Sequence, residues 1–286
     1  MKSAACFDKQ FEYDFISSRY GVYPVSGNAP RLAFLTVSGL LFVASAMVTA
    51  HWCNSMSTMG EMRMPGGWIM SMAWMRLPGQ TWIEASASFL TMWIVMMAAM
   101  MLPSLAPMLW RYRQAIDCTG ELRLERLTLL AGLGYFLVWT LFGLAIFPLG
   151  VMLATTEMDH SELARAVPVA IGVVILIAGA VQFTSWKAHH LACCRGTPER
   201  GQELRADERT AWRQGVSFGM HCGLSCANLT AILLVVGIMD LRIMIAVTAA
   251  ITAERLAPSG QRVAQAIGAV GLVAGLFVIT RAAGLR

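Results

Sequence analysis

Long apolar runs separated by short polar segments follow one another along the whole chain. The runs cover about 32–52, 85–109, 127–150, 166–187, 214–237, 241–256 and 262–281. Most of them reach about 20 residues, the length of helix that crosses a hydrocarbon core of roughly 30 Å, and only the sixth is clearly shorter. The pattern therefore predicts an all-α fold, a polytopic membrane helix bundle with about seven transmembrane helices.

The composition agrees with a membrane protein. Of the 286 residues, 57% are hydrophobic and 14% are charged, whereas soluble domains carry about 25% charged residues. No polar stretch is long enough for a separate soluble domain, so we expect a single integral membrane domain over residues 1–286. Within it we distinguish an N-terminal segment at 1–31, a methionine- and tryptophan-rich loop at 53–84 and a basic loop at 188–213.

Basic side chains predict the orientation of this domain. Lysine and arginine in short loops stay preferentially in the cytoplasm, and here they gather in residues 1–31, 111–126 and 187–213. We therefore expect a multi-pass protein of a bacterial inner (cytoplasmic) membrane with a cytoplasmic N-terminus and the 53–84 loop outside. The net charge of +5 follows from this loop bias, so the expected partner is the lipid bilayer and not nucleic acid.

Methionine is the compositional anomaly, with 20 residues in the chain. Many lie in the 53–84 loop, and a second group repeats at helical spacing in the next apolar run: Met96, Met97, Met100 and Met101. Thioethers are soft, uncharged ligands that suit Cu(I) and can lie in a membrane without the cost of a buried charge. The alternative is that these methionines only fill gaps between packed helices.

Two backbone features bear on how the helices pack. Pro103 removes the amide that would bond the Ala99 carbonyl, so we expect a kink or a freed carbonyl at this end of the run. Gly219 and Gly223 are four residues apart and would let another helix approach closely.

Histidine and cysteine gather in two later segments. The candidate ligands are His189, His190, Cys193, Cys194, His221, Cys222 and Cys226. If the fourth run continues as one helix to Arg195, each of the first two histidines lies one turn from a cysteine, a half-site suited to zinc or copper. Both segments belong to the cytoplasmic end of the predicted topology, so we expect one shared site with Met100, Met101 or Met220 as additional soft ligands. The alternative is interfacial histidines beside packed thiols.

An acidic residue and a basic residue are adjacent near the end of the sixth run, and two roles are open for the acidic one. Glu254, beside Arg255, is either a counter-ion close to this site or one half of an exposed ion pair.

Three segments, taken together, resemble an uncharacterised family of bacterial predicted metal-binding integral membrane proteins. They are Met96–Ser104, Lys187–Arg195 and Gly219–Asp240, and the likeness covers most of residues 85–256. The strongest motif is the double Met-Met pair that runs into Pro-Ser. His190 stands where members of the family usually have a cysteine. The resemblance implies a membrane location and metal binding, and it implies no particular reaction.

These features favour inner-membrane binding and handling, by transfer or delivery, of a soft transition metal. Copper is the expected ion and zinc the alternative, with a membrane or soluble protein as a further partner. The chain has no glycine-rich phosphate loop, which speaks against an ATPase, and we do not expect an enzyme. Two other hypotheses stay open: a non-catalytic accessory subunit of a larger membrane protein complex, and a redox enzyme that uses Cys222 and Cys226.

Overall fold

The computed structural model describes residues 28–58, 62–64, 68–76, 79–116, 120–195 and 207–284, and most of them are helical. The elements are α2 (Asn28–Thr58), β1 (Met62–Arg63), β2 (Ile69–Met70), the 3-10 turn η1 (Met72–Trp74), α3 (Trp82–Ala115), α4 (Glu121–Asp159), α5 (Ser161–Val181), α6 (Ser185–Arg195), α7 (Glu208–Val236), α8 (Leu241–Leu256) and α9 (Gly260–Ala282). The predicted all-α bundle is confirmed. Most of the N-terminal segment predicted at 1–31 lies outside the described residues.

Six helices in the described part of the chain are long and apolar enough to cross a membrane: α2, α3, α4, α5, α7 and α9. The helix α8 occupies the predicted sixth run, but it has only 16 residues, fewer than the roughly 20 that a bilayer requires. It nevertheless extends along the bundle, because Met244 near its start contacts Cys53 of α2 and Glu254 near its end bonds Gln182 after α5.

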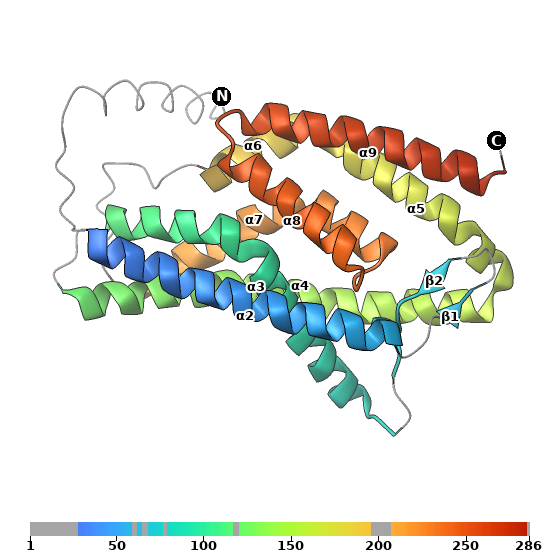
Figure 1. Cartoon of the computed structure of the whole chain (residues 1–286), viewed down its shortest axis with the longest axis horizontal. Helices are drawn as coiled ribbons and strands as arrows, with labels where there is room; N and C mark the ends of the chain where they lie inside the picture. Colours follow the sequence, from blue (N-terminus) through green and yellow to red (C-terminus); the bar gives the residue numbers. More distant parts are fainter. Residues whose placement is uncertain are drawn as a thin grey trace.

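Figure 1 shows how the helices are arranged. The pair α5 and α9 runs along one edge, and α8 lies between this pair and α2 with α3. The start of α2, the end of α3 and the whole of α6 lie toward one end of the bundle, which we call the α6 end. The two short strands and the C-terminus lie at the opposite end, the strand end.

The fourth predicted run is not one helix, and this expectation was wrong. The helix α5 ends at Val181, residues 182–184 form a turn, and α6 begins at Ser185. The amide of Thr184 bonds the Val181 carbonyl (3.1 Å), and the Thr184 hydroxyl accepts a bond from the Lys187 amide (3.2 Å). Thr184 therefore acts as an N-cap that starts a new helix in a new direction.

The helix α3 continues through Pro103 and Pro107 to Ala115. Its two halves run in different directions in Figure 1, in agreement with the bond that Pro103 removes. A capping box fixes its start, where the Thr81 amide donates to Glu84 (2.7 Å) and the Glu84 amide donates to the Thr81 hydroxyl (3.3 Å).

The methionine-rich region at the strand end folds back on the helices. The strands β1 and β2 pair Met62 with Met70 in an antiparallel register. The indole of Trp68 donates to the Ala164 carbonyl of α5 (2.8 Å). Because α2 continues to Thr58, Cys53 lies on a helix and not in the loop expected at 53–84.

Glycines bring two helix pairs into close contact. A Cβ added to Gly219 would lie 2.9 Å from the Tyr135 carbonyl oxygen, and one added to Gly223 would lie 2.4 Å from the Phe142 ring. The close approach expected at these two glycines is confirmed, and the partner is α4. Between α5 and α9, a Cβ added to Gly179 would lie 2.9 Å from the backbone of α9.

We expect Gly215→Ala to destabilise the contact between α4 and α7. The new Cβ would lie 2.1 Å from the Ala131 carbonyl oxygen, so the two backbones must separate, at a cost of about 1–3 kcal/mol in the free energy of unfolding. Thermal unfolding of the protein in detergent measures the change.

Gly132→Ala is the matched control on α4. Its added Cβ meets nothing within 4 Å, so this variant is neutral or gains about 0.5–1 kcal/mol from the better helix propensity. Equal melting temperatures of the two variants would show that α4 and α7 are not packed as described.

Candidate functional site

The methionines that repeat along α3 are fully inside the bundle. Met96, Met97, Met100 and Met101 are each at most 1% exposed. They belong to the extended buried core of the bundle, and so do three cysteines from α6 and α7: Cys194, Cys222 and Cys226. We call these seven residues the sulfur centre. The same core also contains Cys53, Met92 and Met244, so the members of the sulfur centre are connected by the hydrogen bonds described next and not by their shared burial.

The thiol of Cys222 lies at the middle of a buried polar network. Its sulfur lies 2.8 Å from the Tyr135 hydroxyl and accepts a bond from the Arg255 guanidinium, also at 2.8 Å. The Cys226 thiol donates to the Cys222 carbonyl one turn earlier (2.8 Å). A cysteine binds metal as the thiolate, and here a positive charge is already in contact with the sulfur.

Arg255 connects this thiol to the end of the methionine row. The guanidinium donates to the hydroxyl of Ser104 (3.1 Å) and to that of Ser225 (3.2 Å). The Ser104 hydroxyl in turn donates to the Met101 carbonyl (3.0 Å), and the Ser225 hydroxyl lies 3.5 Å from the Cys194 sulfur. One side chain of α8 thus holds α3 and α7 around the cysteines.

Lys187 and Glu254 form a second, fully buried network. Their side chains are 1% and 2% exposed and meet at 2.7 Å. The Gln182 amide donates to the other carboxylate oxygen (2.7 Å), and the Lys187 ammonium also donates to the Ser225 carbonyl. Of the two expectations for Glu254, the exposed ion pair is wrong, because the carboxylate is buried and its partner is Lys187. Lys187 is one of the basic residues of the range 187–213 that predict the orientation, but its side chain lies inside the bundle.

The histidines form a separate row beside the cysteines. The ring centroid of His190 lies 5.4 Å from that of His189 and 5.7 Å from that of His221. The Nδ1 atoms of His190 and His221 are buried and lack a hydrogen-bond partner among the described residues. Burial and the two neighbouring imidazoles lower the pKa of His190, which favours the neutral form that binds metals. On the exposed side, the His189 Nε2 atom lies 3.7 Å from the Cys193 sulfur.

The structure does not bring the predicted histidine and cysteine ligands into one group. Among the described residues, no three or more His, Cys, Asp and Glu side chains are arranged to hold a metal ion. The His221 ring faces His190, whereas the adjacent Cys222 faces Tyr135 and Arg255. What the residues do form is a sulfur centre and, next to it, an imidazole row.

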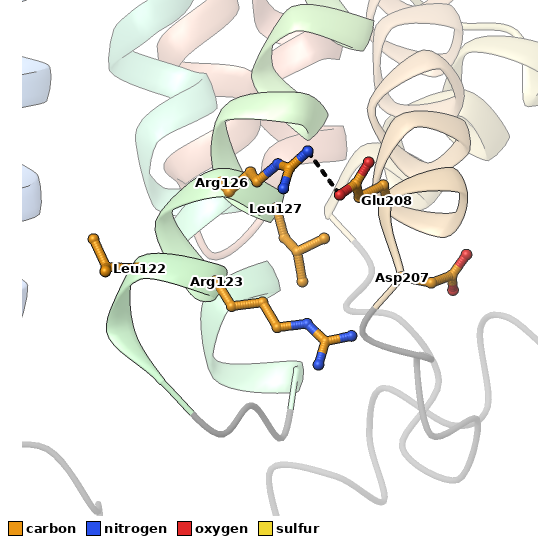
Figure 2. Close-up of a pocket in the computed structure, with 6 residues that line it drawn as sticks. All are labelled: Leu122, Arg123, Arg126, Leu127, Asp207 and Glu208. Carbon is orange, nitrogen blue, oxygen red and sulfur yellow. Dashed lines mark ion pairs between the residues drawn. The ribbon is translucent and has the colours of Figure 1, made fainter.

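A surface pocket opens where α4 and α7 begin, at the α6 end of the bundle (Figure 2). Its lining residues are Leu122, Arg123, Arg126, Leu127, Asp207 and Glu208. Arg126 and Glu208 form an ion pair across it at 2.9 Å. These side chains offer charge and no sulfur or imidazole, so the pocket is not suited to a soft metal.

Comparison with known proteins adds one match. A family model described as PpoB2, copper chaperone, matches residues 90–278, which is more than half of the chain and includes the sulfur centre, the imidazole row and both buried networks. No curated protein and no solved structure matches the chain.

We expect Lys187→Met to destabilise the protein by about 3–5 kcal/mol, because it leaves the buried Glu254 carboxylate without its counter-ion. The double variant Lys187→Met with Glu254→Leu removes both charges and should recover most of this loss. Thermal unfolding in detergent of the single and double variants gives the two values.

Arg126→Ala is the comparison, since it breaks an ion pair whose side chains are 69% and 59% exposed. Such a pair contributes about 0–1 kcal/mol. A Lys187→Met variant no less stable than Arg126→Ala would mean that the 187–254 pair is not buried as described.

Proposed function

The chain belongs to the PpoB2 copper chaperone family, and we propose that it binds Cu(I) in the sulfur centre and hands it to a partner protein. The observation that carries this proposal is the burial of Cys222 and Cys226 one turn apart, with the Arg255 guanidinium in contact with Cys222 and bonded through Ser104 to the helical turn of Met101. Soft sulfur ligands select Cu(I) over harder cations. In this proposal copper is the cargo of the protein.

Within the sulfur centre we assign the tightest binding to the cysteines of α7 with the thioethers nearest to them along the network. Cys222 and Cys226 are one turn apart, and Arg255 connects them through Ser104 to the helical turn that carries Met100 and Met101. Met96 and Met97, one turn further along α3, continue the row of sulfur atoms away from the cysteines.

The charges of this arrangement balance. Two thiolates carry two negative charges, Cu(I) carries one positive charge, and the Arg255 guanidinium supplies the second. A neutral assembly avoids the cost of an uncompensated charge in an apolar interior. The third ligand is either Cys194 as a neutral thiol or a thioether. Because both are uncharged, one can replace the other without a change in the net charge of the site. Such an exchange of ligands suits an ion that must be released.

The imidazole row provides a second binding position for the copper ion. His189, His190, Cys193 and His221 lie next to the sulfur centre, on α6 and at the neighbouring part of α7. His189 is exposed and His190 is half-buried, so the row connects the buried thiols with the surface at the α6 end. We assign to it the transfer of copper, with zinc as the alternative ion at this set of nitrogen and sulfur ligands.

We place the protein in the inner membrane of a bacterium as a single membrane domain with a cytoplasmic N-terminus. Six long apolar helices support the membrane location, and the basic segments support the orientation. The α6 end then faces the cytoplasm, and the 53–84 region faces outward. The partners of this arrangement are the lipid bilayer, the metal ion and a membrane or soluble protein that exchanges copper.

Elemental analysis and anaerobic Cu(I) titration of the detergent-purified protein test this proposal. We expect near-stoichiometric copper in the wild type. The double variant Cys222→Ser with Cys226→Ser should bind Cu(I) more weakly by about 100-fold or more, because loss of a residue that only orients a metal ligand already costs about 10- to 100-fold in affinity. The pair Met100→Leu with Met101→Leu should weaken binding by a smaller factor.

Met47→Leu with Met152→Leu is the matched control, since both side chains are exposed, at 63% and 57%. This variant should bind copper like the wild type. A folded wild-type protein that stays free of copper and zinc after anaerobic loading would contradict the proposal, and its stoichiometric co-purification with a larger membrane complex would favour an accessory subunit instead.

Arg255→Gln tests the role of the guanidinium. Because the variant leaves the bound thiolates with an uncompensated charge, we expect Cu(I) affinity to fall by about tenfold or more. Arg255→Lys keeps the charge and should retain more of the affinity, although it loses the planar set of donors. Competition with a Cu(I) chelator measures both, and equal affinities for wild type and Arg255→Gln would remove Arg255 from the site.

A further inference from the structure

Three sulfur atoms meet at the strand end of the bundle, far from Cys222 of the sulfur centre. Cys53 of α2 is 6% exposed, and its thiol lies 3.9 Å from the Met239 sulfur and 4.0 Å from the Met244 sulfur. Met239 belongs to the short connection between α7 and α8, and Met244 to the first turns of α8. We propose that these three residues, the outer sulfur triad, form a second Cu(I) site.

Two of the three sulfur–sulfur separations in the triad are compatible with a metal shell. Metal–thiolate bonds are about 2.3 Å long, and three sulfur atoms at that distance from a trigonal ion lie about 4 Å from one another. The two separations from the Cys53 sulfur, 3.9 and 4.0 Å, agree with this spacing. The thiol and the two thioethers are thus already placed on one side of a common centre.

The connection that carries the two methionines is held in place by backbone capping. The Gly237 amide bonds the Leu233 carbonyl (3.1 Å) and ends α7. The Asp240 carboxylate accepts bonds from the amides of Arg242 (2.8 Å) and Ile243 (3.3 Å) and starts α8. Met239 and Met244 flank these caps, so their sulfur atoms approach Cys53 from a fixed turn.

The chemistry of the triad selects Cu(I). Thioethers are soft, uncharged ligands that bind hard cations poorly, and a thiolate beside two of them is a ligand set suited to Cu(I). Met56 lies one helical turn beyond Cys53 and is half-buried, so it continues the sulfur ligands toward the methionine-rich region at 62–75.

The triad is distant from Cys222 of the sulfur centre. Met244 precedes Arg255, the residue of α8 that contacts Cys222, by 11 residues, which is about 16 Å along a helix. Cys53 also precedes the residues 90–278 that match the copper chaperone family. The inference therefore goes beyond the proposed function, and each can fail without the other.

The test uses the full-length protein in a background that lacks the three sulfur-centre cysteines, Cys194→Ser, Cys222→Ser and Cys226→Ser. After anaerobic loading, this background should retain one Cu(I) per chain with a sulfur-only shell in X-ray absorption spectra. Adding Cys53→Ser should abolish that copper. Adding Met239→Leu with Met244→Leu should weaken it at least tenfold in chelator competition, with an unchanged melting temperature because leucine preserves the volume of methionine.

Met47→Leu, an exposed change on the same helix α2, is the control and should leave the retained copper unchanged. The inference is overturned if the background binds no Cu(I), if the bound copper has nitrogen or oxygen ligands, or if the methionine pair can be changed without effect on affinity. Loss of copper only on Cys53→Ser and the methionine pair, with the Cys222 and Cys226 variants unaffected in the wild-type background, would support the triad and reject the sulfur centre.

Discussion

Lys187 of α6 and Glu254 of α8 meet 2.7 Å apart where α5, α6, α7 and α8 come together. Neither charge is stable alone in such an interior, so the two helices that carry them must be in register. Gln182 binds the second carboxylate oxygen and fixes the turn from which α6 starts. With Glu254 held there, the next residue, Arg255, is directed at Cys222. The contacts of the Cys222 thiol thus depend on the position of the buried ion pair between Lys187 and Glu254.

The helices could be predicted from the sequence because their signal is local. Apolar runs of bilayer length gave the six long helices close to their observed bounds, and the short sixth run gave α8. The break at 182–184 was missed, because no proline or glycine marks it. Its causes are the N-cap provided by Thr184 and the bond from Gln182 to Glu254, which is 72 residues distant in the chain. Only the folded chain shows that second contact.

The candidate site could be predicted in its chemistry and less well in its geometry. Methionine and cysteine spacing identified the α3 row and the cysteines of α7, which the structure buries in one cluster. Spacing alone could not show that His221 and Cys222, although adjacent in sequence, contact different residues. Their side chains point about 100° apart on the helix, and the sequence does not say which neighbour lies on each side. The burial of Lys187 could not be predicted, because a lysine at the end of an apolar run is equally typical of an exposed helix end. Its burial depends on a carboxylate that the sequence places two helices later.

The chain positions of the buried pair also constrain biogenesis. Lys187 is synthesised 67 residues before Glu254, and until α8 emerges its ammonium group has no carboxylate to meet. A buried lysine without its carboxylate is costly, so α6 cannot take its final place in the bundle before α8 has been synthesised. The core around the cysteines can therefore close only after the last turns of α8 are available.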